Sequence, residues 1–230
     1  MNTIFDIKIE ITPDEILAAQ KRKNAPPQII QDETERAIEV AYALATPKLL
    51  YAWAEITILE PKHVTLKLIG SNLGKRLYLG PNANQLAHAH HVLIEVHTIG
   101  RYLENRVTEL NQNGKLLQAY LLDCAGVVAL SKVNTAAHQL VEKAAKEKEW
   151  GVGASIGPGS LTGWSLNCQY ELCSLLELDQ IDLQLSNSHL LIPVKSASSM
   201  VGIGPNYKGK KVGSICHLCS LRETCWRRKK

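Results

Sequence analysis

The chain has 230 residues, of which 45% are hydrophobic and 21% charged, and its formal net charge is +4. A chain of this length buries roughly 70% of its unfolded surface and so needs no disulfide or metal to fold. The small, dispersed charge argues against a nucleic-acid partner. Apolar runs shorter than the roughly 18–20 residues of a membrane span argue against a membrane protein.

The N-terminal residues show no signal-peptide pattern, so a cytoplasmic location is expected. In that compartment the six cysteines are expected to be thiols or metal ligands, not a disulfide framework.

Alternating apolar and charged residues predict a strand over residues 4–11. Thr12 and Pro13 then match the N-cap and first position of a helix, which should end before a linker at residues 24–27. A second helix is predicted over residues 32–44. Strands over residues 50–59 and 63–69 follow it.

Apolar residues at helical spacing predict two long helices, over residues 82–111 and 115–149, which a short turn should make antiparallel. Asp123 lies among apolar positions of the second helix and, if buried, needs a polar partner. The first helix would carry four histidines, for which a surface cluster is favoured over a metal site: His88, His90, His91 and His97.

Four glycines within residues 151–159 predict a loop whose backbone N–H groups could meet a carboxylate or phosphate. The loop has neither the Lys-Ser/Thr of a phosphate loop nor the spacing of a dinucleotide fingerprint. A helix over residues 167–178 and paired strands over 183–194 and 198–203 complete the chain's regular structure. The sum is an α+β domain with a mostly antiparallel sheet covered by long helices.

The last cysteines form the most chemically distinctive segment. Cys216 and Cys219 have the two-residue gap of a metal-binding pair, Cys225 follows closely, and Cys168 or Cys173 could complete the set. An iron–sulfur cluster, a zinc ion and plain thiols all remain open, and the basic residues 227–230 would favour thiolates. We therefore divide the chain into a domain over residues 1–205 and a basic, cysteine-containing tail over 206–230.

Residues 157–169, GPGSLTGWSLNCQ, resemble the turn and following helix of the reactivation domain of cobalamin-dependent methionine synthase. Motifs at residues 98–104, 122–123 and 185–204 are similar to that family in order and spacing, so the resemblance covers most of residues 5–204. It implies one domain with a curved, mostly antiparallel sheet that binds S-adenosylmethionine and presents it to a corrinoid protein.

On this resemblance the chain is an accessory protein that assists reductive reactivation or methylation of the cobalt in a partner's cobalamin. The partner would be a corrinoid protein or a cobalamin-dependent methyltransferase, and self-association is left open. An iron–sulfur cluster in the tail would supply the electron. The residues expected at the S-adenosylmethionine site are Gly157, Pro158, Gly159, Ser160, Trp164 and Lys195.

Two family side chains differ in this sequence. Residues 154–156 contain no counterpart of the Arg that precedes the Pro-Gly turn, and Ser160 replaces an aromatic residue after it. The alternative hypothesis is therefore an iron–sulfur or zinc-binding interaction module without S-adenosylmethionine chemistry. A third is a subunit of a corrinoid-dependent methyltransferase complex.

Overall fold

The protein is described by a computed structural model covering residues 3–18 and 26–225. A seven-stranded sheet has the order β4-β3-β2-β5-β9-β6, with β1 paired to the first half of β2. Every pairing between its strands is antiparallel, which confirms the predicted α+β fold. The strands of this sheet are β1 (Thr3–Asp6), β2 (Lys48–Leu59), β3 (His63–Leu68), β4 (Gly74–Tyr78), β5 (His91–Thr98), β6 (Gly151–Ile156) and β9 (Ser196–Gly204).

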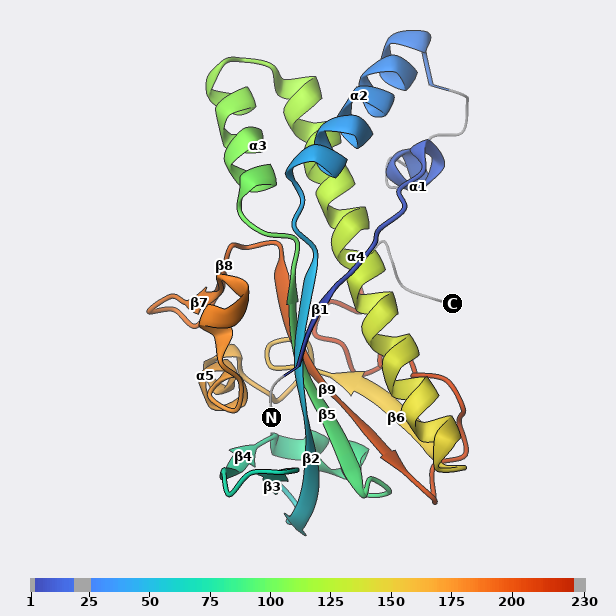
Figure 1. Ribbon diagram of the computed structural model, residues 1–230, viewed down its shortest axis with the longest axis vertical. Coiled ribbons are helices and arrows are strands. Elements are labelled where there is room, and N and C mark those ends of the chain that lie inside the picture. The colour runs from blue at the N-terminus through green and yellow to red at the C-terminus, as the bar shows by residue number, and fades with distance from the viewer. Residues whose placement is uncertain (1–2, 19–25, 226–230) are drawn as a thin grey trace.

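Helices cover the sheet unevenly. The long helix α4 runs down one side of it, while α2 and α3 gather with the first half of α4 at one end of the molecule (Figure 1). A small hairpin of β7 (Gln184–Leu185) and β8 (Leu191–Ile192) lies on the opposite side with α5 (Figure 1). The helices are α1 (Pro13–Ala18), α2 (Gln28–Leu44), α3 (Tyr102–Gln112), α4 (Leu116–Glu147) and α5 (Gln169–Cys173), with 3-10 helices η1 (Gly80–Leu86), η2 (Leu166–Cys168) and η3 (Leu178–Ile181).

The two faces of the sheet carry separate cores. On β5, Val92 and Ile94 alternate with Leu93, as side chains on a strand must. The first two pack in the core that contains Trp164, and Leu93 packs with Val141 of α4. Because both faces are covered, β5 is buried along nearly its whole length, including the polar residues Glu95, His97 and Thr98.

Helix α4 is, within the described residues, the one helix long and apolar enough to cross a membrane by length and composition. In this fold Ala125, Ala129 and Val133 of α4 are buried in the core that it shares with α2 and α3. The same apolar composition therefore serves here to cover a sheet.

Several sequence predictions are confirmed. Helix α1 begins at Pro13, and Thr12 caps it reciprocally with Glu15: the Glu15 N–H donates to Thr12 Oγ1 at 3.4 Å and the Thr12 N–H to Glu15 Oε2 at 3.1 Å. Helices α2 and α4 and strands β2 and β3 lie where expected, although α2 begins four residues early. Part of the predicted linker at 24–27 falls outside the described residues.

The predicted helix over residues 82–111 is wrong. Its middle is strand β5, its start is η1, and only Tyr102–Gln112 is α-helical. The histidines therefore share no helix: His90 and His91 instead place their rings 5.5 and 5.2 Å from the Trp150 ring. A strand buried on both faces has a continuous apolar run, which hydrophobic spacing does not distinguish from a buried helix.

The predicted loop at 151–160 is half wrong, because Gly151–Ile156 is strand β6. Its glycines make room for Tyr207: a Cβ on Gly151 would lie 1.9 Å from the Tyr207 carbonyl oxygen, and one on Gly153 2.9 Å from its ring. Two further predictions need correction. The helix expected over 167–178 shortens to α5 between two 3-10 turns, and β9 pairs with β5 and β6, not with residues 183–194.

Candidate functional site

Residues 157–164, hereafter the turn, connect the end of β6 to η2. Gly159 and Gly163 have φ of +75° and +82°, a region that L side chains rarely adopt. The Gly159 N–H donates to the Trp164 carbonyl at 2.9 Å, and the Ser160 N–H donates to the Gly157 carbonyl at 3.2 Å. The prediction that these glycine-loop N–H groups are free for a ligand is therefore wrong for Gly159 and Ser160.

The turn is supported from beneath by buried side chains. Trp164 is 2% exposed and packs in the sheet core. Asn82 of η1, also buried, donates through Nδ2 to the Thr162 carbonyl at 3.0 Å and to the Leu79 carbonyl at 3.3 Å. Trp164 thus stabilises the turn from the core side, and the exposed residues of the turn include Gly159 and Ser160.

Strand β9 lies directly against the start of the turn. A Cβ on Gly157 would lie 2.6 Å from the Ser198 carbonyl oxygen, so this position requires glycine. The Ser198 hydroxyl donates to Gln169 Oε1 at 3.2 Å, and Gln169 Nε2 donates to the His189 carbonyl at 2.9 Å. Gln169 therefore joins α5, the last strand and the β7–β8 hairpin beside the turn.

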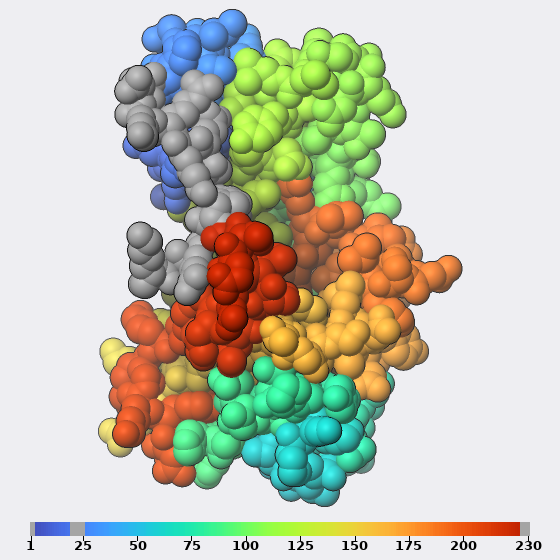
Figure 2. Space-filling view, turned by 180° about the vertical axis from the view of Figure 1, so that it is seen from behind, coloured from blue at the N-terminus to red at the C-terminus, as the bar shows by residue number. Residues whose placement is uncertain are grey.

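The C-terminal segment lies along the turn and bonds to its backbone, while Gly159, Ser160 and Thr162 stay exposed. Residues 209–225, hereafter the strap, run along β6 and then along the turn: the Gly213 N–H donates to the Gly153 carbonyl at 3.0 Å. The Thr162 N–H donates to the Leu218 carbonyl at 3.1 Å, and the Ser220 N–H to the Ser160 carbonyl at 3.0 Å. Figure 2 shows this red segment lying against the gold surface formed by residues near 160.

The strap is held to the domain by few apolar contacts. Val212, Ile215 and Leu218 are half-buried and pack against the two cores of the sheet. Ser220 adds a hydroxyl hydrogen bond to the Gly159 carbonyl at 3.2 Å. Most other strap residues are exposed, so the segment predicted as an appendage is thin and docked against the domain.

A buried polar network lies under α4, on the other face of the sheet. Glu95 Oε2 lies 2.8 Å from His97 Nδ1, and both side chains are almost fully buried. Ser199 donates to Glu95 Oε1 at 2.6 Å. Burial by itself raises the pKa of Glu95. Three neighbours lower it and outweigh burial: His97 through its charge and hydrogen bond, Ser199 through its hydroxyl, and His138 through its charge. The pKa of Glu95 therefore lies below its ordinary value of 4.5.

This network reaches the strand that leads into the turn. Ser155, which lies two residues before Gly157, donates through its Oγ to Ser199 Oγ at 3.0 Å. The β6–β9 register shifts between Val152 and Ser155, so the Ser155 bond fixes the strand where the ladder resumes. The sequence analysis did not single out Glu95, because this residue lay within the helix expected over residues 82–111. The pattern that could have identified it is a single carboxylate within an apolar run.

Lys195 lies on the α3–α4 side of β9. Its Nζ is 2.5 Å from Asp123 Oδ1, so Asp123 has a charged partner although its side chain is 47% exposed and not buried. The Lys195 N–H donates to Glu104 Oε1, and the lysine stem packs over Gly126. The structure thus engages Lys195 with helices, whereas the other five expected S-adenosylmethionine-site residues lie within the turn.

No cysteine within the described residues forms a disulfide. Burial, and then the charge of Glu171, raise the pKa of Cys168, and burial raises that of Cys173 to about 12. Across residues 3–18 and 26–225, no three His, Cys, Asp or Glu side chains are grouped as a metal site requires. Cys219 pairs through its backbone with Leu161, while the basic residues 227–230 lie outside the described part.

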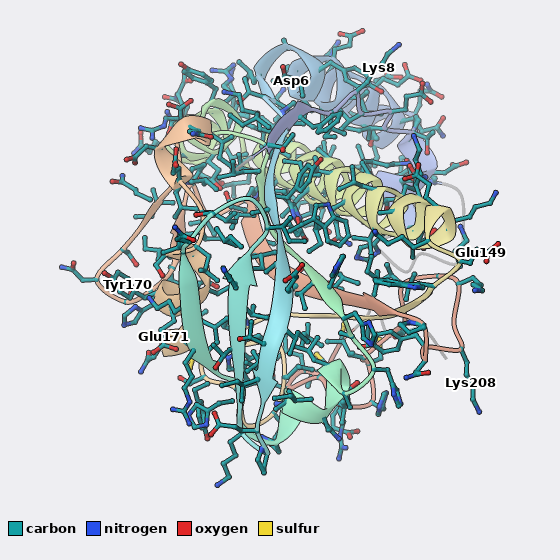
Figure 3. All side chains as sticks on the ribbon, turned by 60° about the horizontal axis from the view of Figure 1, so that its bottom comes forward. Asp6, Lys8, Glu149, Tyr170, Glu171 and Lys208 are labelled. Atoms are coloured by element: carbon teal, nitrogen blue, oxygen red, sulfur yellow. The ribbon has the colours of Figure 1, made fainter. Side chains whose placement is uncertain are left out.

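An open groove of about 720 Å³ runs beside α5 and the β7–β8 hairpin. Its lining includes Tyr170, Cys173 and His189, and Glu177 and Asp179 make it acidic. Tyr170 and Glu171 point away from the sheet at this side of the molecule (Figure 3). This groove therefore lies beside α5, the same helix that carries Gln169 next to the turn.

At the level of sequence, no protein-family model and no curated protein matches this chain. A similar solved structure is the crystal structure of the MetH reactivation domain bound to AdoHcy. It superposes with a TM-score of 0.66 and 12% sequence identity, over 94% of this chain and 82% of that chain. At 12% identity the similarity establishes the fold alone. This fold is the one implied by the resemblance of residues 157–169 to the reactivation domain.

Proposed function

We propose that this protein is an accessory component of a corrinoid methyl-transfer system, assisting the reductive reactivation or methylation of cobalt in a partner's cobalamin. The observation that carries the proposal is the similarity of almost the whole chain to a methionine synthase reactivation domain. The partner is a corrinoid protein or a cobalamin-dependent methyltransferase.

Within this proposal, S-adenosylmethionine binds at the turn. The structural neighbour is bound to AdoHcy, the demethylated form of that compound. In support, the turn adjoins both β9 and the α5 helix that carries Gln169, as the family motif requires. Since the Gly159 and Ser160 N–H groups are already bonded, the ligand contacts would come from the exposed Ser160 hydroxyl and from groups beside the turn.

The proposal is tested by following the cobalt directly. A corrinoid protein in the cob(II)alamin state is mixed anaerobically with the full chain, S-adenosylmethionine and titanium(III) citrate, and the visible spectrum is recorded. One electron and one methyl group convert cob(II)alamin to methylcob(III)alamin and leave AdoHcy. We expect the full chain to accelerate this conversion over the mixture lacking it; equal rates would contradict the proposal.

A second candidate is an iron–sulfur or zinc-binding module built on Cys216, Cys219, Cys225 and Cys168. The two-residue gap between Cys216 and Cys219 supports it, and the Cys219 backbone and the Cys168 thiol lie beside Leu161 and Trp164 of the turn. Assembly would require the strap thiols to regroup, since they form no metal site as described. Iron, zinc and sulfide analysis of anaerobically purified protein, with electron paramagnetic resonance, tests this candidate.

A further inference from the structure

The strap and a ligand would compete for the same part of the turn. Gly159, Ser160 and Thr162 each give a polar backbone atom to the strap, through Leu218 and Ser220. The carbonyls of Gly159 and Ser160 belong to residues at which S-adenosylmethionine binding is proposed. A ligand seated on this exposed side of the turn would meet the strap first.

The end of the strap can leave without unfolding the domain. In residues 216–225 the apolar attachment is the half-buried Leu218, whereas Val212 and Ile215 anchor the start of the strap and the Val212 N–H donates to Glu142 Oε1 at 3.0 Å. Segments with few buried contacts and exposed hydrogen bonds open locally at much lower free energy than the core.

We infer that the strap inhibits ligand binding at the turn, because it must release the Gly159 and Ser160 carbonyls and the Thr162 N–H before S-adenosylmethionine binds there. This inference rests on the proposed function of the turn. The hydrogen bonds and half-buried side chains of the strap are offset by the backbone entropy of ordering it, which leaves a closing preference of roughly 10- to 100-fold. The apparent dissociation constant for the ligand is raised by the same factor, because only the open fraction binds.

The test uses two full-length variants that keep every cysteine. Leu218→Asp places a charge where the side chain packs against the core, and so opens the strap. Leu221→Asp makes the same change at a side chain that is 62% exposed, three residues along the same segment. Binding of S-adenosylmethionine is measured by calorimetry for both variants and the wild type.

We expect Leu218→Asp to bind roughly 10- to 100-fold more tightly than the wild type, with Leu221→Asp unchanged. Amide hydrogen exchange supplies a second readout: ligand should accelerate exchange at Ser220, whose N–H is bonded to Ser160 in the closed state. Equal affinities in all three proteins, or slower exchange at Ser220 with ligand, would overturn the inference and leave the proposed function standing. Binding by none of the three would overturn both.

Discussion

Replacing Glu95 with Gln removes a buried negative charge while keeping the size of the side chain. The Glu95 carboxylate accepts hydrogen bonds from His97 Nδ1 and Ser199 Oγ, and a hydrogen bond to a charged group contributes about 1.5–3 kcal/mol. The Ser199 hydroxyl can still donate to the Gln oxygen, which retains about 1 kcal/mol. We therefore expect Glu95→Gln to lower the free energy of unfolding by about 2–5 kcal/mol at pH 7.

The assay is urea unfolding followed by circular dichroism, with Glu39→Gln on the exposed side of α2 as the matched control. The control should change the unfolding free energy by no more than about 0.5 kcal/mol. The wild type can be measured across pH in the same way, which separates the charge of Glu95 from its shape.

Acid should abolish the difference between wild type and variant. Because the folded pKa of Glu95 lies below its ordinary value of 4.5, its charge stabilises the fold above that pH. The stabilisation is lost as pH falls through the folded pKa, since the protonated carboxyl has no charge to pair with His97. If Glu95→Gln unfolds at the same urea concentration as the wild type at pH 7, the network contributes nothing to stability and the reasoning is refuted.

Three further predictions concern the turn, the ion pair on α4 and the buried thiol. Gly157→Ala should lower the unfolding free energy by about 1–3 kcal/mol in thermal melts, because its Cβ meets a β9 carbonyl. Gly213→Ala, whose Cβ would make an ordinary 3.5 Å contact, should lower the unfolding free energy less. Equal losses in the two variants would contradict the close packing at Gly157. Asp123→Asn should lower the unfolding free energy by no more than about 1 kcal/mol, since the carboxylate is half-exposed. The double mutant Asp123→Asn/Lys195→Met should lose little more unfolding free energy than either single mutant, because both changes remove the same ion pair. Cys173, whose pKa is raised to about 12 by burial, should resist iodoacetamide at pH 8 until the protein unfolds, and fast labelling of native protein would show that burial wrong.

The parts of the fold that the sequence predicted are those with one buried face. Helices α2 and α4 and strand β3 each show a period that matches a single covered side. Strand β5 has both faces covered, so its period vanished and a helix was expected in its place. The glycines of β6 indicated a loop, because the residue for which they make room, Tyr207, lies 54 residues after Gly153 in the chain.

The place of the turn in the fold was predictable from the sequence, but its hydrogen bonding was not. The Pro158-Gly159 motif located the turn correctly between β6 and the helix that carries Gln169. That its N–H groups bond within the turn, and that the strap bonds to it, depends on tertiary contacts that no local spacing encodes. The cysteine spacing likewise indicated a metal pair without showing that Cys219 would lie beside Leu161.

The most direct test of the account is a calorimetric titration of the full-length protein with S-adenosylmethionine under anaerobic conditions. We predict saturable binding at one site per chain that AdoHcy competes away and that Gly157→Ala weakens. Heat of dilution alone, in both the wild type and the strap-opened Leu218→Asp protein, would contradict binding at the turn and the function proposed from it.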